Sequence, residues 1–417
     1  MFTIYRVLIN FILLISPVIL IYRILKKKED YKRCLEKIGF INKKRNRGKL
    51  IWFHGSSVGE ILSVIPLIEI LEKKKDIKQI LLTSNTLSSA NVFNKFKLKK
   101  TIHQFCPIDS NLVAKKFLNY WKPSSAFFIE SEIWPNLIFN IKEKKIPLGL
   151  INARITNRSF KKWNKISFFS KYVFNKFDFC LAQNSETKNY LKKLGASNIK
   201  KIGNLKFSET SFKNTYSFEK DTKELLNKKK ILFAGVSTHS SEEIFCANIH
   251  LKLKKKYPNG ITIIIPRHIH RSNQIKDEIE ELGLNVCLHS SKKNKLNKNI
   301  DIYLVDTFGE TKSFIKVCKI VFLGGSLIKH GGQNPLEAAR FGCKVIHGPN
   351  IGNFSEVYNL LNKNKISLKI NNLNSAKKII DQNLVNKFSS KQIINKLNTI
   401  GKKVLNKNKY EIIKYIE

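Results

Sequence analysis

Short apolar runs alternate with longer amphipathic stretches along most of the chain. Strands that are buried on both faces form continuous apolar runs, and their alternation with helices is typical of parallel sheets. The predicted strands are residues 50–53, 80–83, 126–129, 148–151, 179–182 and 199–202 in the first half, and 231–234, 261–265, 285–288, 302–305, 320–323 and 344–346 in the second.

Because this pattern occurs twice, it predicts an α/β fold with two doubly wound domains in tandem. The length of 417 residues also exceeds that of one usual domain. We expect an amino-terminal anchor at 1–25, a first domain at 26–211, a polar Lys-rich linker at 212–230, and a second domain at 231–417 that includes the terminal helix.

Residues 7–22 are almost wholly apolar and are followed by Arg23 and by Lys26 to Lys28. This length is near the lower limit of about 17 to 25 residues for a membrane-spanning helix. The charges follow the apolar segment, unlike in a cleaved signal peptide, and the positive-inside rule places the remaining chain in the cytoplasm. We expect an uncleaved anchor that spans once or lies in the interface. The alternative is an apolar first helix that docks on the domain.

The chain is strongly basic, with 76 Lys and Arg against 31 Asp and Glu and a formal charge of +45. Such a charge favours nucleic acid or an anionic membrane surface as a partner. The lysines are scattered and no Arg-rich stripe stands out, so a compositional bias explains much of the excess. Seven cysteines without a CxxC pair are typical of reduced thiols in the cytoplasm. Since no Asp-x-Asp pair occurs, we expect no metal cofactor.

Polar blocks follow the predicted strands, where ligands bind in sheets of this kind. They are HGSSVGE (54–60), ESEIWPN (130–136), NARITNRS (152–159), GNLKF (203–207), AGVSTHSSEE (234–243), PRHIHR (266–271), DTFGET (306–311) and GGS (324–326). Neither GxGxxG nor GxxxxGK[ST] occurs, which argues against a dehydrogenase and a P-loop nucleotidase.

The segment GGQNPLEAARFG, residues 331–342, predicts a helix start that faces a phosphate. Asn334 suits the N-cap, Pro335 the first helical position and Gly342 the helix end. Unpaired N–H groups at such a start attract an anion. The alternative is an ordinary strand-to-helix turn in which Asn334 and Glu337 form a capping pair.

The same ambiguity applies to Glu60, which closes the capping-box pattern Ser57-x-x-Glu60. A carboxylate there could also accept a proton as a general base. We expect it to stay ionised, because the helix dipole favours the anion.

Taken in order, WFHGSSVGE, ESEIWPNL, NARITNRS, GNLKF, STHSSEE, PRHIHR, VDTFGE, GGSLIKHGGQNPLEAA and GPNIGNF resemble the Kdo transferases over essentially the whole chain. These membrane-anchored bacterial enzymes add 3-deoxy-D-manno-octulosonic acid (Kdo) from CMP-Kdo to the lipid A precursor. The resemblance implies a GT-B fold, with two Rossmann-like domains facing a central cleft. The acceptor would bind the first domain and the CMP-sugar the second.

The resemblance also implies roles for residues. Glu60 matches the catalytic base, and Glu130 and Lys206 match the residues that act on the transition state. The implied CMP contacts are Arg267, His268, Phe308, Gly309, Glu310, Asn334, Pro335, Leu336 and Glu337. Two positions depart from the family pattern: Gln333 stands where histidine is usual, and Ala338 where proline is frequent. Arg154 and Arg158 remain open candidates for binding the Kdo carboxylate.

The implied function is an inverting, metal-independent transfer of Kdo to lipid IVA in lipopolysaccharide synthesis. The partners would be CMP-Kdo, the lipid acceptor and the anionic bacterial inner membrane, with both domains on its cytoplasmic side. The basic residues after the anchor would contact the headgroups: Lys26 to Lys28, Lys32, Arg33, Lys43, Lys44, Arg45 and Arg47.

Two alternatives belong to other classes. A nucleic-acid-binding protein would need an Arg-rich and aromatic-rich surface and no apolar anchor, so we expect no nucleic acid. A sugar-nucleotide epimerase of related fold would explain a nucleotide site, but not the anchor or HGSSVGE.

Overall fold

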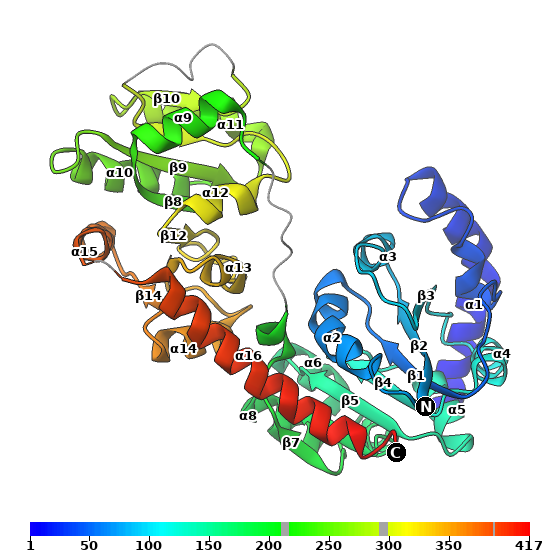
Figure 1. The fold of residues 1–417 in the computed structure, drawn as a ribbon. Coiled ribbons are helices and arrows are strands. Elements are labelled where there is room, and N and C mark those ends of the chain that lie inside the picture. The colour runs from blue at the N-terminus through cyan, green and yellow to red at the C-terminus, as the bar shows by residue number, and fades with distance from the viewer. Residues whose placement is uncertain (210–216, 292–298, 387) are drawn as a thin grey trace. The chain divides into compact units, whose positions relative to one another are not determined.

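The computed structural model describes residues 1–209, 217–291, 299–386 and 388–417 (Figure 1). The chain divides into two compact units, Met1–Thr210 with Ile400–Glu417 (unit 1) and Ser211–Thr399 (unit 2). In the described residues each unit contains one seven-stranded sheet, and every strand pair in both sheets is parallel. The predicted doubly wound α/β fold is confirmed.

The sheet of unit 1 has the strand order β3-β2-β1-β4-β5-β6-β7. Its strands are β1 (Lys49–His54), β2 (Ile77–Ser84), β3 (Thr101–Phe105), β4 (Ser125–Ile129), β5 (Leu148–Ala153), β6 (Phe179–Ala182) and β7 (Ile199–Lys201). The helices are α1 (Phe2–Leu25), η1 (Cys34–Ile38), α2 (Val58–Leu71), α3 (Leu87–Phe93), α4 (Asn111–Trp121), α5 (Pro135–Glu143), α6 (Asn157–Asn164), α7 (Ser167–Phe174), α8 (Ser185–Lys193) and η2 (Leu205–Ser208).

Both faces of this sheet are covered, as the central strand β1 shows. Leu50 and Trp52 enter the core that α4 and α5 close, whereas Ile51 and Phe53 enter the core beneath α2. Successive side chains of a strand point to opposite faces, so burial on both faces requires the unbroken apolar run that the sequence has.

The sheet of unit 2 has the order β10-β11-β9-β8-β12-β13-β14. Its strands are β8 (Lys230–Thr238), β9 (Gly260–Pro266), β10 (Val286–Leu288), β11 (Ile302–Leu304), β12 (Ile320–Leu323), β13 (Lys344–His347) and β14 (Ser367–Lys369). The helices are α9 (Lys220–Lys228), α10 (Glu242–Lys254), η3 (Ile269–Arg271), α11 (Ser272–Glu280), α12 (Thr311–Val317), α13 (Leu336–Arg340), α14 (Ser355–Lys363) and α15 (Leu373–Val385). Helix α16 (Ser390–Ile413) continues from unit 2 into unit 1.

The strand order changes direction between β1 and β4 in unit 1, and between β8 and β12 in unit 2. Ligands of doubly wound sheets bind outside the carboxyl ends of the strands at such a switch point. The fold therefore marks two places for functional residues, one in each unit.

Every predicted strand is present, but the edge strands β3 and β14 were not predicted. Strand β3 is rich in polar residues that are nevertheless buried. Trp121 Nε1 donates to Gln104 Oε1 at 3.0 Å, and the His103 ring bonds Ser84 Oγ at 2.9 Å. Hydropathy cannot predict a strand whose side chains are buried through specific hydrogen bonds.

Two predicted boundaries are wrong. The segment 220–228, placed in the linker, forms α9, and Thr222 Oγ1 lies 3.3 Å from Tyr303 Oη inside unit 2. The end of α16 and the residues after it belong to unit 1. Ile412 and Ile416 enter the core there, and the ring of Tyr415 stacks on that of Phe179 with 4.3 Å between centroids. The predicted boundary between 211 and 212 lies outside the described residues.

Helix α1 is the one helix of the described residues that is long and apolar enough to cross a membrane. Its most apolar window has a mean hydropathy of 2.3, and only 11% of that window is buried. Figure 1 shows α1 running along unit 1 near α4 and α5.

The α16 contact predicts an effect of a single methyl group. A Cβ at Gly401 would lie 2.4 Å from the carbonyl oxygen of Phe207, which is rigid backbone, whereas a Cβ at Gly352 would meet no atom within 4 Å. We expect Gly401→Ala to lower the free energy of unfolding by about 1–3 kcal/mol through overpacking. Gly352→Ala should leave it unchanged or raise it by less than about 1 kcal/mol. Equal melting midpoints for the two variants would contradict this packing.

Candidate active site

The first switch point holds Glu60 at the start of α2, directly beyond β1. Ser57 is the N-cap, and its hydroxyl oxygen accepts a hydrogen bond from Glu60 N at 3.3 Å. In return, Ser57 Oγ donates to Glu60 Oε1 and Ser56 N donates to Glu60 Oε2, each at 2.7 Å. The capping arrangement thus exists and fixes the carboxylate in one orientation, so capping and catalysis are compatible roles.

The electrostatics of Glu60 differ from the expectation that the helix dipole keeps it readily ionised. Burial is the largest influence and raises the pKa of this carboxyl, and the charges of Glu132 and Glu130 raise it further. The bonds from Ser57 and Ser56 act in the opposite direction but do not outweigh them. Glu60 therefore holds a proton more tightly than an ordinary glutamate.

Glu130 and Lys206 meet in an ion pair, although they follow different strands. Lys206 Nζ lies 2.6 Å from Glu130 Oε1, and both side chains are largely buried. A Cβ at Gly59, the neighbour of Glu60, would lie 3.6 Å from Lys206 Cε. The three residues assigned by resemblance are therefore gathered at the switch point of unit 1.

A buried amide network holds the loop that carries Lys206. Gln183 Nε2 donates to the Asn152 carbonyl at 2.9 Å, and Asn204 Nδ2 donates to Gln183 Oε1 at 3.0 Å. Asn152 Oδ1 accepts from Leu205 N, and Asn204 Oδ1 from Lys206 N, both at 2.9 Å. Gln183 was missed because it lies outside the quoted blocks; its position directly after β6 was the available signal.

A second buried network supports the carboxylate of Glu132. His54 is fully buried, and its Nε2 lies 3.1 Å from Glu132 Oε2, which also accepts from Trp134 Nε1 at 2.8 Å. Burial alone would lower the pKa of His54, but Cys106 and Glu132 outweigh it and raise the pKa to about 10. Burial raises the pKa of Glu132, but the hydrogen bonds from His54 and Trp134 outweigh it and lower that pKa below the usual value. The charge of Glu132 in turn acts on Glu60.

In unit 2 the residues that are predicted to bind CMP follow β9, β11 and β12. Arg267 and His268 are exposed, and Arg267 N donates to the Thr238 carbonyl at 2.9 Å. Phe308 is 82% exposed, and Gly309 has a left-handed φ of 91°. Glu310 Oε2 lies 3.1 Å from His289 Nε2 and also accepts from Thr307 Oγ1.

The helix predicted at Asn334 begins one residue later than expected. The N-cap is Pro335 and the helix starts at Leu336, because Asn334 Oδ1 reaches forward to accept from Leu336 N at 3.1 Å. Gly342 has a φ of 80° beyond the helix end, as predicted. Glu337 Oε1 lies 3.3 Å from Lys312 Nζ, so Glu337 forms an ion pair with α12 and does not pair with Asn334 as a cap.

Contacts within unit 2 bring these groups together. The His239 ring lies 5.8 Å from His268 and 4.5 Å from His330, measured between ring centroids. The three histidine rings thus connect the residues after β9 with the loop after β12. The ion pair of Lys312 and Glu337 connects α12, which follows β11, with α13, which follows that loop. Gln333 is half-buried, and its carbonyl accepts from Tyr358 Oη at 2.9 Å.

The carboxylate of Glu242 builds the loop after β12. It is fully buried and accepts hydrogen bonds from Gly325 N, Ser326 N and Leu327 N at 2.6, 3.1 and 3.0 Å. Because these amides are occupied by a protein carboxylate, the GGS block shapes the loop and does not offer those N–H groups to a ligand.

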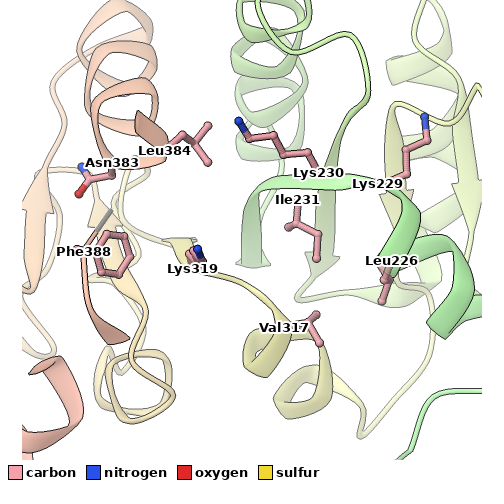
Figure 2. A pocket seen from close by; sticks show the side chains of 9 residues that line it. All are labelled: Leu226, Lys229, Lys230, Ile231, Val317, Lys319, Asn383, Leu384 and Phe388. Carbon is pink, nitrogen blue, oxygen red and sulfur yellow. The ribbon is translucent and has the colours of Figure 1, made fainter. Parts of the chain in front are cut away.

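A cavity of about 250 Å³ lies elsewhere in unit 2 (Figure 2). Its lining includes Lys230 and Ile231 at the start of β8 and Lys319 just before β12. The cavity therefore lies at the amino ends of the strands, whereas the predicted CMP-binding residues follow the carboxyl ends.

Comparison with known proteins shows the family of the chain. A sequence model of the family described as 3-deoxy-D-manno-octulosonic-acid transferase (kdotransferase) matches residues 32–209. The 3-deoxy-D-manno-octulosonic acid transferase of Rickettsia bellii is 34% identical over 381 residues, which cover 90% of both chains. The chain belongs to the Kdo transferase family. The Haemophilus influenzae member is 28% identical over 362 residues, covering 86% of this chain and 84% of that one.

Membership of the Kdo transferase family makes the chain a glycosyltransferase. Its fold is similar to that of a UDP-N-acetylglucosamine 2-epimerase from Listeria monocytogenes, with a TM-score of 0.59. The two are 14% identical, and the match covers 88% of this chain and 97% of that one. Likeness at this identity concerns the fold alone, and the fold is GT-B-like.

The amide network predicts that Gln183 positions Lys206. Gln183→Met keeps the volume but leaves the Asn152 carbonyl and the Asn204 amide without their partner, which should cost about 2 kcal/mol of stability. We expect the displaced lysine to lower kcat about ten- to a hundredfold at temperatures well below melting.

Gln79→Met is the matched control, because buried Gln79 also bonds one carbonyl and one N–H, those of Lys44 and Asn46, both at 2.9 Å. It should lower stability similarly and leave kcat unchanged. A similar loss of kcat in both variants would show that the amide network has only a structural role.

Proposed function

We propose that the chain transfers Kdo from CMP-Kdo to a hydroxyl group of the lipid A precursor lipid IVA, with Glu60 as the general base. The observation that carries this proposal is the oriented Glu60 carboxylate with its raised pKa, next to the buried pair of Lys206 and Glu130.

The proposed reaction needs no reactant besides CMP-Kdo and the lipid acceptor. The acceptor oxygen forms a bond to the anomeric carbon of Kdo while its proton passes to Glu60. The bond from that carbon to the phosphate oxygen breaks, and CMP leaves with the electron pair. Because the acceptor enters on the face opposite to CMP, the transfer inverts the anomeric configuration.

Charged groups of unit 1 would act on the sugar in the transition state. Glu130 can stabilise the positive charge that develops on the ring, and the ion pair with Lys206 holds the Glu130 carboxylate in place. For the Kdo carboxylate, Arg154 is better placed than Arg158, since Arg154 N donates to the Glu130 carbonyl at 3.2 Å. Arg158 is exposed on α6.

The residues that follow β9, β11 and β12 in unit 2 would bind the CMP group of the donor substrate. Arg267 and His268 supply cationic or donor groups for the phosphate, and Glu337 can accept from ribose hydroxyls while it shares Lys312. Phe308 to Glu310 and Asn334 to Leu336 provide the remaining walls. We propose that these groups offset the phosphate charge without a metal ion, and that the enzyme works at the cytoplasmic face of the bacterial inner membrane.

Replacing the base tests the proposal. We expect Glu60→Ala to lower kcat at least about 10²–10⁴-fold, because that range is typical of general-base catalysis, and to leave CMP binding unchanged. Transfer is measured by mass spectrometry of lipid IVA incubated with CMP-Kdo and EDTA.

The control is Glu69→Ala, since Glu69 is an exposed carboxylate on the same helix. Ordinary turnover of the Glu60 variant would refute the base assignment. Isomerisation of the CMP-sugar without lipid would instead favour the epimerase alternative, whose fold this chain shares.

The environment of Glu60 predicts opposite pH shifts in two variants. Only the ionised base accepts a proton, so kcat/KM falls as pH drops through the pKa of Glu60. Ser57→Ala removes a hydrogen bond that lowers this pKa, so the acid limb of the kcat/KM profile should move to higher pH. Glu132→Gln removes a charge that raises it, so the limb should move to lower pH.

Ser63→Ala is the control, because Ser63 Oγ donates to the backbone carbonyl of Glu60 at 2.7 Å and not to its carboxylate. Its acid limb should not move. Shifts of Ser57→Ala and Glu132→Gln in the same direction would mean that another group limits the reaction at low pH.

A further inference from the structure

One face of α1 contacts the rest of unit 1 along the whole helix. The buried and half-buried residues recur about every third or fourth position, which is the period of one helical face. These residues are Phe2, Tyr5, Arg6, Ile9, Leu13, Ser16, Leu20, Arg23 and Ile24. With a rise of about 1.5 Å per residue, the contact stripe extends over about 36 Å for 24 residues.

The amino-terminal end of α1 is held by polar contacts. Tyr5 Oη donates to Asp109 Oδ2 at 2.6 Å, and Arg6 Nε donates to Asn136 Oδ1 at 3.1 Å. Asp109 is buried and also accepts from Asn136 N at 2.9 Å. Further along the helix, Asn10 Oδ1 accepts from Ser110 Oγ at 3.1 Å.

The carboxyl-terminal end of α1 is held by charges. Arg23 Nε lies 2.7 Å from Glu29 Oε1, whose side chain is fully buried. Lys37 Nζ lies 2.6 Å from the same oxygen and donates to the Asn85 carbonyl at 3.0 Å. Both ends of α1 are therefore held by polar and charged residues of unit 1.

This geometry is incompatible with a spanning helix. If α1 crossed a bilayer, the stripe and its partners Asp109, Glu29 and Lys37 would enter the hydrocarbon, where ionisable groups are very unfavourable. The helix must instead lie parallel to the surface of unit 1.

The opposite face of α1 is apolar and exposed. Leu14, Val18 and Leu25 are 76%, 71% and 76% exposed. The other exposed apolar side chains are Ile4, Val7, Leu8, Phe11, Ile12, Ile15, Ile19, Ile21 and Tyr22. A continuous apolar face of this length on a water-exposed helix indicates an interaction surface.

Neighbouring groups favour a lipid surface as the occupant. Lys26 to Lys28 directly follow α1, and Tyr31 beyond them is 68% exposed. At the other end Tyr172, 45% exposed, lies 6.2 Å from Phe2 between ring centroids, and Lys176 Nζ lies 5.0 Å from the Tyr172 ring. Aromatic and basic residues at both ends of an apolar face are typical of helices in the headgroup region of anionic membranes.

We propose that α1 lies in the plane of one anionic leaflet, with the face of Leu14 and Val18 among the acyl chains and both helix ends on the side of unit 1. Asn136 belongs to the block that starts at Glu130, so the same contacts hold the candidate acceptor site beside the headgroups. The inference extends the proposed membrane location. Because it is scored by vesicle binding without substrate, its failure is distinguishable from failure of the proposed transfer.

Depth measurements distinguish the arrangements. Val7→Cys, Leu14→Cys and Leu25→Cys each carry a fluorophore on the same exposed face of α1, while the seven native cysteines are buried. With brominated phosphatidylglycerol vesicles, we expect equal shallow quenching depths at all three sites. A deep Leu14 with shallow ends would overturn the proposal in favour of a spanning helix, and no lipid quenching at any site would overturn membrane contact.

Paired substitutions test the face itself. Leu14→Glu with Val18→Glu should lower the fraction bound to phosphatidylglycerol vesicles at least tenfold. The control is Val317→Glu with Val385→Glu, since these exposed residues lie in unit 2 and should not affect binding. Circular dichroism verifies folding of both. If sedimentation without lipid shows a dimer that the α1 variant abolishes while vesicle binding persists, the face binds a second copy and the proposal is wrong.

Discussion

The functional geometry depends on the parallel direction of all strands in each sheet. The carboxyl ends of all strands lie on the same side of the sheet, so residues that are far apart in the sequence meet there. Glu60 and Glu130 follow β1 and β4, which are neighbours in the sheet although β2 and β3 separate them in the chain. Both faces of the sheet are filled with apolar side chains, and polar chemistry therefore concentrates at this edge.

Placing the groups at that edge has an energetic cost. Glu130 and Asn152 adopt left-handed φ values of 56° and 48°, which are unfavourable for residues with a side chain. Removing the charges of Lys206 and Glu130 from water adds a desolvation cost. Hydrogen bonds offset part of it: Glu130 N donates to the Ile151 carbonyl at 3.0 Å, and the amides of Asn152, Gln183 and Asn204 fix the opposing loop. Several buried polar groups must therefore find their partners together before the site can form.

Helix α1 shows why hydropathy alone did not settle its role. Tyr5 and Arg6 precede the apolar segment and Asn10 interrupts it, and in the structure all three bond other parts of unit 1. An average over a window cannot distinguish a span with tolerated polar residues from a helix that bonds the rest of its domain along one face. The distinction requires the partners, Asp109 and Asn136, which lie far away in the chain.

The sequence by itself determined the fold class, all the described strands except β3 and β14, and the polar blocks that follow the strands, because apolar runs and strand-end motifs are local patterns. Through resemblance it also led to the proposal that Glu60, Glu130 and Lys206 are site residues. Only the tertiary structure decided that Lys206 pairs with Glu130, that Gln183 holds its loop, that the end of α16 completes unit 1, and that β3 is a buried strand. Each of these depends on long-range contacts between polar or individually weak segments. The raised pKa of Glu60 belongs to the same class, since burial and the charges of Glu132 and Glu130 exist only once the chain has folded.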